Sequence, residues 1–72
     1  MVVVYTKSEC QPCKLTKAAL TRKGIEFEER NIEENEGYYA EVKEMGFSSV
    51  PVVKTWDDSW AGLRPDKLAL LK

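Results

Sequence analysis

The sequence predicts one small α/β domain whose mixed four-stranded sheet is flanked by three helices, in the order β-α-β-α-β-β-α. Three patterns lead to this class: a β-branched run near the N-terminus, an amphipathic segment directly after it, and two short apolar segments separated by turn residues. A chain of 72 residues accommodates one domain, placed at 1–72, with a limited core. Its composition, 43% hydrophobic and 32% charged, is typical of globular proteins.

The first two strands are expected on either side of a helix. Val2 to Thr6 is a β-branched run whose unbroken valines indicate burial on both faces, as in the middle of a sheet. Ile25 to Arg30 begins with alternating apolar and polar residues, which is typical of a strand with one exposed face. A β-α-β crossover is right-handed and its strands are parallel, so these two strands should run in the same direction.

The intervening helix is expected from about Gln11 to Lys23. Pro12 suits the first helical turn, where its missing N–H is not needed, and Gly24 suits the position just after the helix. The apolar stripe predicted to face the core consists of Leu15, Ala18 and Ala19, with Leu20 beside it.

The second half predicts a helix, two strands and a last helix. The helix covers about Asn35 to Met45, and Val50 to Val53 forms the third strand. Trp56 to Trp60 contains turn residues between two aromatics and should lead into a short fourth strand. The last helix starts at Arg64-Pro65-Asp66. The expected buried positions of the two helices are Tyr38, Val42, Met45, Leu68 and Leu71.

The two cysteines carry the chemistry that the sequence predicts. Cys10 and Cys13 form a C-x-x-C motif at the junction of the first strand and first helix, which indicates a redox pair. Unpaired N–H groups at a helix N-terminus favour a thiolate at Cys10. Cys10 would attack a partner's disulfide, and the more buried Cys13 would then release the partner and leave a Cys10–Cys13 disulfide. Lys7 and Lys14 are placed to add positive potential.

Other interpretations of the motif are weaker. A purely structural disulfide is unusual in a chain without a secretory signal. Structural zinc needs four ligands, whereas this sequence has two cysteines and no histidine, so a metal or iron–sulfur cluster would have to be bridged between two chains. A redox-inert binding module is a further alternative. We therefore expect no metal and no cofactor other than the Cys10–Cys13 disulfide.

Charge and hydropathy exclude several classes of function. A net charge of −1 gives no basis for nucleic-acid binding. No signal peptide and no apolar run of membrane-spanning length is visible, so we expect a cytoplasmic protein that does not enter a membrane. Basic residues crowd the first third of the chain and glutamates the middle, either as solvated faces or as a basic end that docks an acidic partner.

Three segments of the sequence resemble a known family. They are Tyr5-Thr6-Lys7 ahead of the cysteine motif, Ser49-Val50-Pro51-Val52-Val53, and Trp60-Ala61-Gly62-Leu63-Arg64-Pro65-Asp66. In this order they resemble the NrdH-redoxins, glutaredoxin-sized members of the thioredoxin superfamily, over essentially the whole chain. The last segment is the specific one. The resemblance implies a thioredoxin fold and dithiol–disulfide oxidoreductase activity.

The resemblance also implies partners. Such proteins take electrons from NADPH through thioredoxin reductase and pass them to class Ib ribonucleotide reductase. A glutathione-dependent glutaredoxin is the alternative within the same chemistry. It is disfavoured because Ala61 to Arg64 lacks the Gly-Gly turn through which glutaredoxins bind glutathione. A monomer suits a carrier that presents the same face to two partners in turn.

The expected site follows from these matches. Pro51 corresponds to the family's cis-proline, which lets the backbone at Val50 pair with an incoming peptide; an edge-strand trans-proline is the alternative. Trp60 has two expected roles, core packing or docking. The complete set expected to bind partners is Lys7, Gln11, Pro12, Val50, Pro51, Trp60, Gly62, Leu63 and Arg64, around the catalytic Cys10 and Cys13.

The chain departs from the family pattern at two places. Ala61 and Leu63 stand where the family more often has serine and phenylalanine, which removes one hydroxyl and shrinks an apolar contact. Gln11-Pro12 puts proline directly before the second cysteine, as in thioredoxins, and this predicts a more reducing pair than in glutaredoxins.

Overall fold

A computed structural model describes residues 1–71 and contains one mixed sheet with three helices. The elements are β1 (Val2–Thr6), α1 (Gln11–Arg22), β2 (Phe27–Asn31), α2 (Glu36–Glu44), β3 (Val52–Lys54), β4 (Ser59–Ala61) and α3 (Pro65–Leu70). The strands lie in the order β2-β1-β3-β4, with β1 and β2 parallel and the other two pairs antiparallel. The expected element order and fold class are confirmed. None of the helices within 1–71 is long and apolar enough to cross a membrane.

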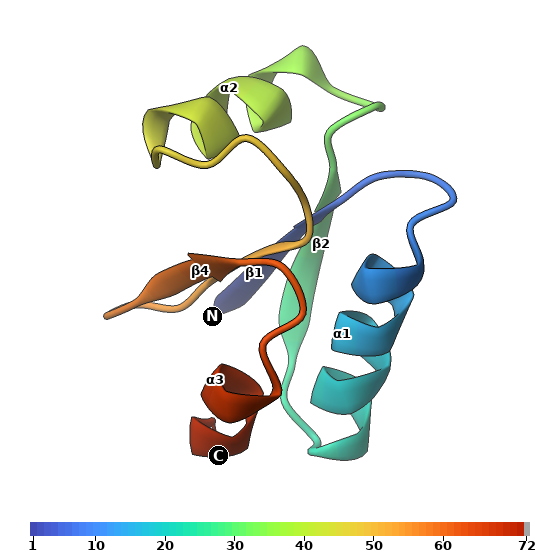
Figure 1. Ribbon diagram of the computed structural model, residues 1–72, viewed down its shortest axis with the longest axis vertical. Helices are drawn as coiled ribbons and strands as arrows, with labels where there is room; N and C mark the ends of the chain where they lie inside the picture. The colour runs from blue at the N-terminus through green and yellow to red at the C-terminus, as the bar shows by residue number, and fades with distance from the viewer. Residues whose placement is uncertain (72) are drawn as a thin grey trace.

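The sheet separates two apolar cores. Helices α1 and α3 cover one face and α2 covers the other (Figure 1). The buried residues of the first core are Val4, Leu20, Val53, Trp60 and Leu68. Those of the second core are Tyr5, Val42 and Val52, with Tyr38, Met45 and Phe47 packed against them. Because β1 is central, its alternate side chains Val4 and Tyr5 enter opposite cores.

The prediction of the buried stripe on α1 was wrong for Leu15 and Ala18, although Leu20 is buried and Ala19 packs against the first core. Leu15 is 44% exposed and Ala18 is exposed, whereas the buried side chains of the helix are Cys13, Thr16 and Leu20. Counting apolar residues favoured the Leu15 stripe because it gave no weight to cysteine and threonine. The helix is instead rotated so that Cys13 points inward.

The predicted ends of two strands also shift. β2 begins at Phe27 rather than Ile25, and Ile25 still packs against the first core. β3 begins at Val52 because Val50 and Pro51 belong to the connection that enters it. The other predicted helices agree closely with α2 and α3: Asn35 and Met45 are the caps of α2, and Leu68 is the buried residue of α3.

A polar network fastens α2 to the sheet. The Tyr5 hydroxyl donates to Glu41 Oε1 at 2.5 Å, and Arg30 Nη1 contacts the same oxygen at 2.6 Å. Arg30 Nε also pairs with Glu28 at 2.6 Å. Burial, together with the bond to Glu41, raises the pKa of Tyr5 to about 12. The bond from Tyr5, with help from Arg30, lowers the pKa of Glu41.

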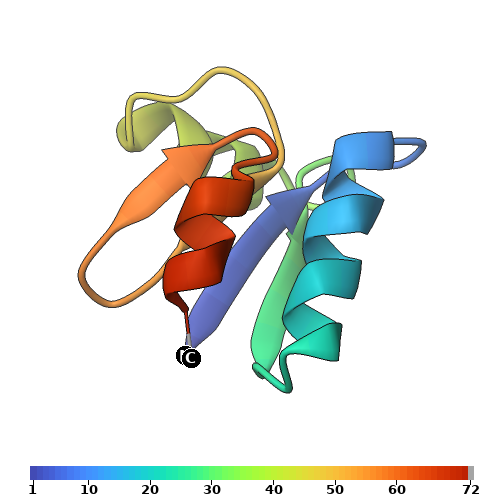
Figure 2. The ribbon, with the colours of Figure 1, turned by 60° about the horizontal axis from the view of Figure 1, so that its bottom comes forward.

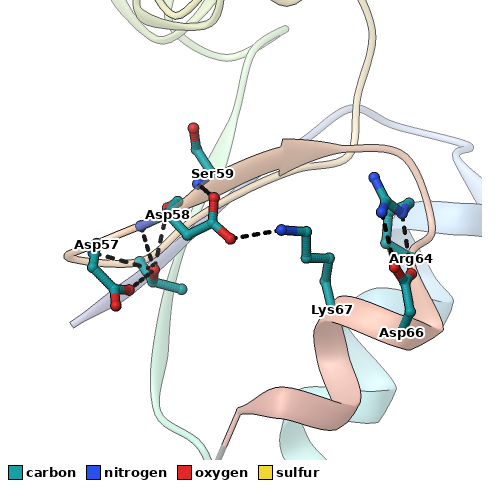
Figure 3. A network of polar contacts seen from close by, with 7 residues as sticks. Asp57, Asp58, Ser59, Arg64, Asp66 and Lys67 are labelled. Carbon is teal, nitrogen blue, oxygen red and sulfur yellow. Dashed lines mark hydrogen bonds and ion pairs between the residues drawn. The ribbon is translucent and has the colours of Figure 1, made fainter.

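A second polar cluster joins the β3–β4 hairpin to α3 (Figure 3). Thr55 closes the turn by donating its N–H to the Asp58 carbonyl at 2.8 Å. The Asp58 carboxylate then contacts Lys67 Nζ of α3, also at 2.8 Å. The hairpin turn expected around Trp56 is thereby tied to the last helix.

Removing the hydroxyl of Tyr5 should weaken the attachment of α2. We expect Tyr5→Phe to lower the free energy of unfolding by about 1 kcal/mol near neutral pH, because Glu41 loses a buried partner. The raised pKa means that this contribution is complete below pH 10.0 and is lost as the pH rises toward about 12. Urea unfolding of both proteins at a series of pH values measures the difference.

The matched control is Tyr39→Phe. Tyr39 is 46% exposed, so the loss of its hydroxyl should change stability by less than about 0.5 kcal/mol. Equal losses in the two variants would contradict a specific role for the Tyr5–Glu41 bond.

Candidate functional site

The turn between β1 and α1 brings Cys10 to the N-terminus of the helix. Glu9 has a φ of 54°, a left-handed conformation that costs a non-glycine residue about 1–2 kcal/mol. Cys10 follows with an extended φ of −118° and serves as the N-cap of α1. Its carbonyl accepts the first helical hydrogen bond, from Lys14 N at 3.1 Å. Pro12 lies in the first turn, as predicted.

The two cysteines form a disulfide. Their Cα atoms are 5.2 Å apart, and the backbone N–H of Cys13 donates to Cys10 Sγ at 3.2 Å. The first turn of α1 contains no acidic side chain. The helix N-terminus and this N–H group therefore both favour negative charge on the Cys10 sulfur when the bond is reduced. Cys10 is 5% exposed and Cys13 is 1% exposed, so a partner reaches Cys10 more easily.

A glutamate after β2 supports the turn that carries Cys10. The backbone N–H of Ser8 donates to Glu33 Oε1 at 3.0 Å, and this bond lowers the pKa of the Glu33 carboxyl. Sequence reasoning missed this residue. It is one of several glutamates in the middle of the chain, and nothing local distinguishes it from its neighbours.

The connection into β3 lies at the same end of the sheet. Val52, the first residue of β3, pairs with Tyr5 near the end of β1, so Pro51 lies beside the strand end that leads to Cys10. The Val50–Pro51 peptide bond is cis, which confirms the expectation from the family match. Gly62 has a φ of 86° and donates its N–H to the Pro51 carbonyl at 2.7 Å. Three segments distant in sequence thus meet at one end of the sheet.

The expected partner-binding residues are distributed around this end of the sheet. The N-terminal ends of α1 and α3 both face it (Figure 2). The exposed members are Lys7, Gln11, Pro12, Leu63 and Arg64, the half-buried ones are Val50 and Gly62, and Pro51 is buried. Arg64 forms two bonds to the Asp66 carboxylate, at 3.1 and 2.8 Å, which hold its guanidinium against the start of α3 (Figure 3). This pairing lowers the pKa of Asp66.

Trp60 belongs to the core. It is 4% exposed and packs with Val53, Leu20 and Leu68, so its ring offers almost no surface to a partner. Of the two roles expected for it, the structure supports packing and gives no support to docking. Trp60 thereby anchors β4 in the first core, and the exposed Leu63 follows shortly after the strand.

A cavity of about 470 Å³ lies between α1 and α3, and neither cysteine lines it. Its lining residues are Ala19, Arg22, Lys23, Pro65, Leu68 and Ala69, and none of these is an expected site residue. This cavity is therefore separate from the expected site at Cys10 and Cys13.

Comparison with known proteins identifies the family. A family model described as glutaredoxin matches residues 2–58. The glutaredoxin-like protein NrdH of Lactococcus lactis subsp. lactis (strain IL1403) is 42% identical over 71 residues, covering 99% of both chains. NrdH of Escherichia coli (strain K12) is 34% identical over 67 residues, covering 93% of this chain and 83% of its own. The chain belongs to the NrdH glutaredoxin-like proteins.

A solved structure agrees with this assignment. NrdH-redoxin from Escherichia coli, a glutaredoxin-like protein reported with a thioredoxin-like activity profile, matches with a TM-score of 0.93 and 34% identity. The match covers 99% of this chain and 93% of that one. The expected family and the thioredoxin-like fold are both confirmed. The Cys10–Cys13 disulfide is the redox centre of a thiol–disulfide oxidoreductase.

The reduced protein should be alkylated selectively. We expect iodoacetamide to modify Cys10 before Cys13 at neutral pH, and faster than it modifies free cysteine, because Cys10 is the N-cap and the less buried thiol. Peptide mapping after partial reaction identifies the modified residue. Preferential labelling of Cys13, or a rate no higher than that of free cysteine, would contradict the assignment.

Proposed function

We propose that this oxidoreductase carries electrons from thioredoxin reductase to class Ib ribonucleotide reductase. The observation that carries the proposal is the position of the Cys10 sulfur at the N-terminus of α1, next to the segments that contain Pro51 and Gly62. The NrdH relatives and the thioredoxin-like activity profile reported for the Escherichia coli NrdH-redoxin support the choice of partners. The absence of a Gly-Gly turn between Ala61 and Arg64 argues against glutathione as the main reductant.

Cys10 and Cys13 act in turn during the proposed electron transfer. The reduced Cys10 thiolate attacks a disulfide of the acceptor, which forms a mixed disulfide and releases one acceptor thiolate. The Cys13 thiolate then attacks Cys10 Sγ, so that the internal disulfide forms and the second acceptor thiolate leaves. The acceptor gains two electrons and the Cys10–Cys13 pair loses two. Thioredoxin reductase reverses this change with electrons from NADPH.

The segments beside the cysteines would hold the partner. An incoming peptide pairs with the backbone at Val50, as the family match implies, while the Gly62–Pro51 hydrogen bond keeps this edge next to Cys10. Leu63 is 39% exposed and supplies an apolar contact, and the exposed Arg64 adds positive charge. Lys7, Gln11 and Pro12 complete the surface around the sulfur.

We also propose the setting in which the protein works. The internal disulfide is the whole redox centre, so no metal or organic cofactor takes part. The carrier is a cytoplasmic monomer that does not bind nucleic acid and does not enter a membrane. One exposed site then serves the reductase and the acceptor in turn.

A coupled assay separates the two sources of electrons. We expect rapid NADPH oxidation with thioredoxin reductase and a disulfide substrate, and little with glutathione plus glutathione reductase. Leu63→Ala should then raise the KM for the carrier, whereas Leu70→Ala, at an exposed residue of α3, should leave it unchanged. The opposite preference between reductants would make the chain a glutathione-dependent glutaredoxin and remove the support for ribonucleotide reductase.

Cysteine variants should divide the reaction into its two steps. Cys10→Ser should abolish turnover, because no thiolate remains to attack the acceptor. Cys13→Ser should accumulate a disulfide-linked complex with the acceptor. This complex should be visible by non-reducing electrophoresis and should be cleaved by dithiothreitol. If Cys13→Ser kept full dithiol activity, the roles assigned to the two cysteines would be wrong.

A further inference from the structure

Helix α1 buries the hydroxyl of Thr16. Thr16 is 1% exposed, and within the described chain, residues 1–71, its Oγ1 makes no hydrogen bond. A helical threonine usually bonds the carbonyl three or four residues before it, and here it does not. Buried polar groups without partners are rare because they lose their hydrogen bonds to water and form none within the protein. The hydroxyl at Thr16 is therefore a candidate for an interaction made in another state of the protein.

The sulfur of Cys13 is the group that changes state beside it. Cys13 and Thr16 are three residues apart on the buried face of α1, where Cβ atoms at this spacing lie about 5–6 Å from each other. Cys13 is 1% exposed, and its sulfur is bonded to Cys10 in this oxidised structure. Reduction frees that sulfur and, when Cys13 ionises, leaves a negative charge in the interior.

The two cysteines differ in the donors available to them. Cys10 Sγ already accepts the N–H of Cys13, whereas no side chain among residues 1–71 donates to Cys13 Sγ. A threonine side chain in a helix has two accessible χ1 rotamers, so its hydroxyl can turn without moving the backbone. A hydroxyl that donates to an anion makes one of the stronger hydrogen bonds.

We propose that Thr16 donates a hydrogen bond to the Cys13 sulfur once the disulfide opens and thereby promotes the step that releases the partner. In that step the Cys13 thiol first loses its proton to solvent, and the thiolate attacks Cys10 Sγ. The Cys13–Cys10 bond forms, the bond between Cys10 and the partner breaks, and the partner leaves as a thiolate that takes a proton from solvent. Thr16 keeps its own proton throughout. This role rests on the proposed direction of exchange, with Cys10 attacking and Cys13 releasing.

The test compares Thr16→Val, which keeps the shape and loses the hydroxyl, with Thr16→Ser, which keeps the hydroxyl. Reduced protein is mixed with the aromatic disulfide DTNB, which releases one coloured thiolate when Cys10 attacks and a second when Cys13 resolves the mixed disulfide. We expect Thr16→Val to raise the pKa of Cys13 by about one unit. Because the more basic thiolate is also the better nucleophile, the second release should slow about threefold near neutral pH, and the first should be unchanged. NMR titration of isotope-labelled cysteine Cβ measures that pKa, and Thr16→Ser should restore both values.

The possible results separate the role of Thr16 from the attack by Cys10. Unchanged second release and unchanged Cys13 pKa in Thr16→Val would overturn the inference, even if its melting temperature shifted, because the hydroxyl would then be structural. The inference would also be overturned if Thr16→Ser changed the second release and the Cys13 pKa as much as Thr16→Val does. If the unsubstituted protein showed no fast first release, the proposed attack by Cys10 would fail instead, independently of Thr16.

Discussion

The structure depends on the pairing of β1 with a neighbour on each side. β2 runs parallel to it and β3 antiparallel, so the C-terminal end of β1 meets the start of β3. That arrangement places the turn to Cys10 and the cis bond before Pro51 at the same end of the sheet. The alternating side chains of β1 also divide the interior into two cores, which fix α1 and α3 on one face and α2 on the other.

Long-range polar contacts brace the segments around the disulfide. Glu33, just after the end of β2, supports the turn before Cys10, and Asp58 ties the β3–β4 hairpin to α3 through Lys67. Lys17 of α1 reaches Glu29 of β2 at 2.9 Å, so one of the basic residues in the first third of the chain forms an ion pair within the protein. Exposed ion pairs of this kind stabilise little individually, and here they link segments that lie far apart in the sequence.

The surface around Cys10 and Pro51 is small, and main-chain atoms form much of it in the proposed site. Cys10 is only slightly exposed and Pro51 is buried, while Leu63 and Arg64 are among the exposed side chains nearby. In the proposed function, such a site would recognise partners through a short stretch of main chain and a few flanking contacts, which would suit exchange with two different proteins. Trp60 is not part of this surface, because its ring packs into the first core and anchors β4 there.

Some of the site could be predicted because its signals are local. The C-x-x-C spacing, Pro12 in the first turn and Gly24 after the helix all act within one or two turns of chain, so Cys10 at a helix N-terminus could be inferred directly. The family match supplied Pro51 and the segment from Trp60 to Arg64. It could not say that the Trp60 ring is buried, since that depends on how β4 packs against α1 and α3.

The sequence by itself determined the order of elements, the ends of the helices and the redox pair, because capping, turn and periodicity preferences are set by neighbouring residues. Only the tertiary structure decided which face of α1 is buried, with Cys13 and Thr16 inward and Leu15 outward. It alone also decided that Glu33 supports Ser8 and that Glu41, 36 residues from Tyr5, is its partner. These contacts depend on strand register and helix rotation, which are properties of the assembled sheet and are not encoded in any short stretch of chain.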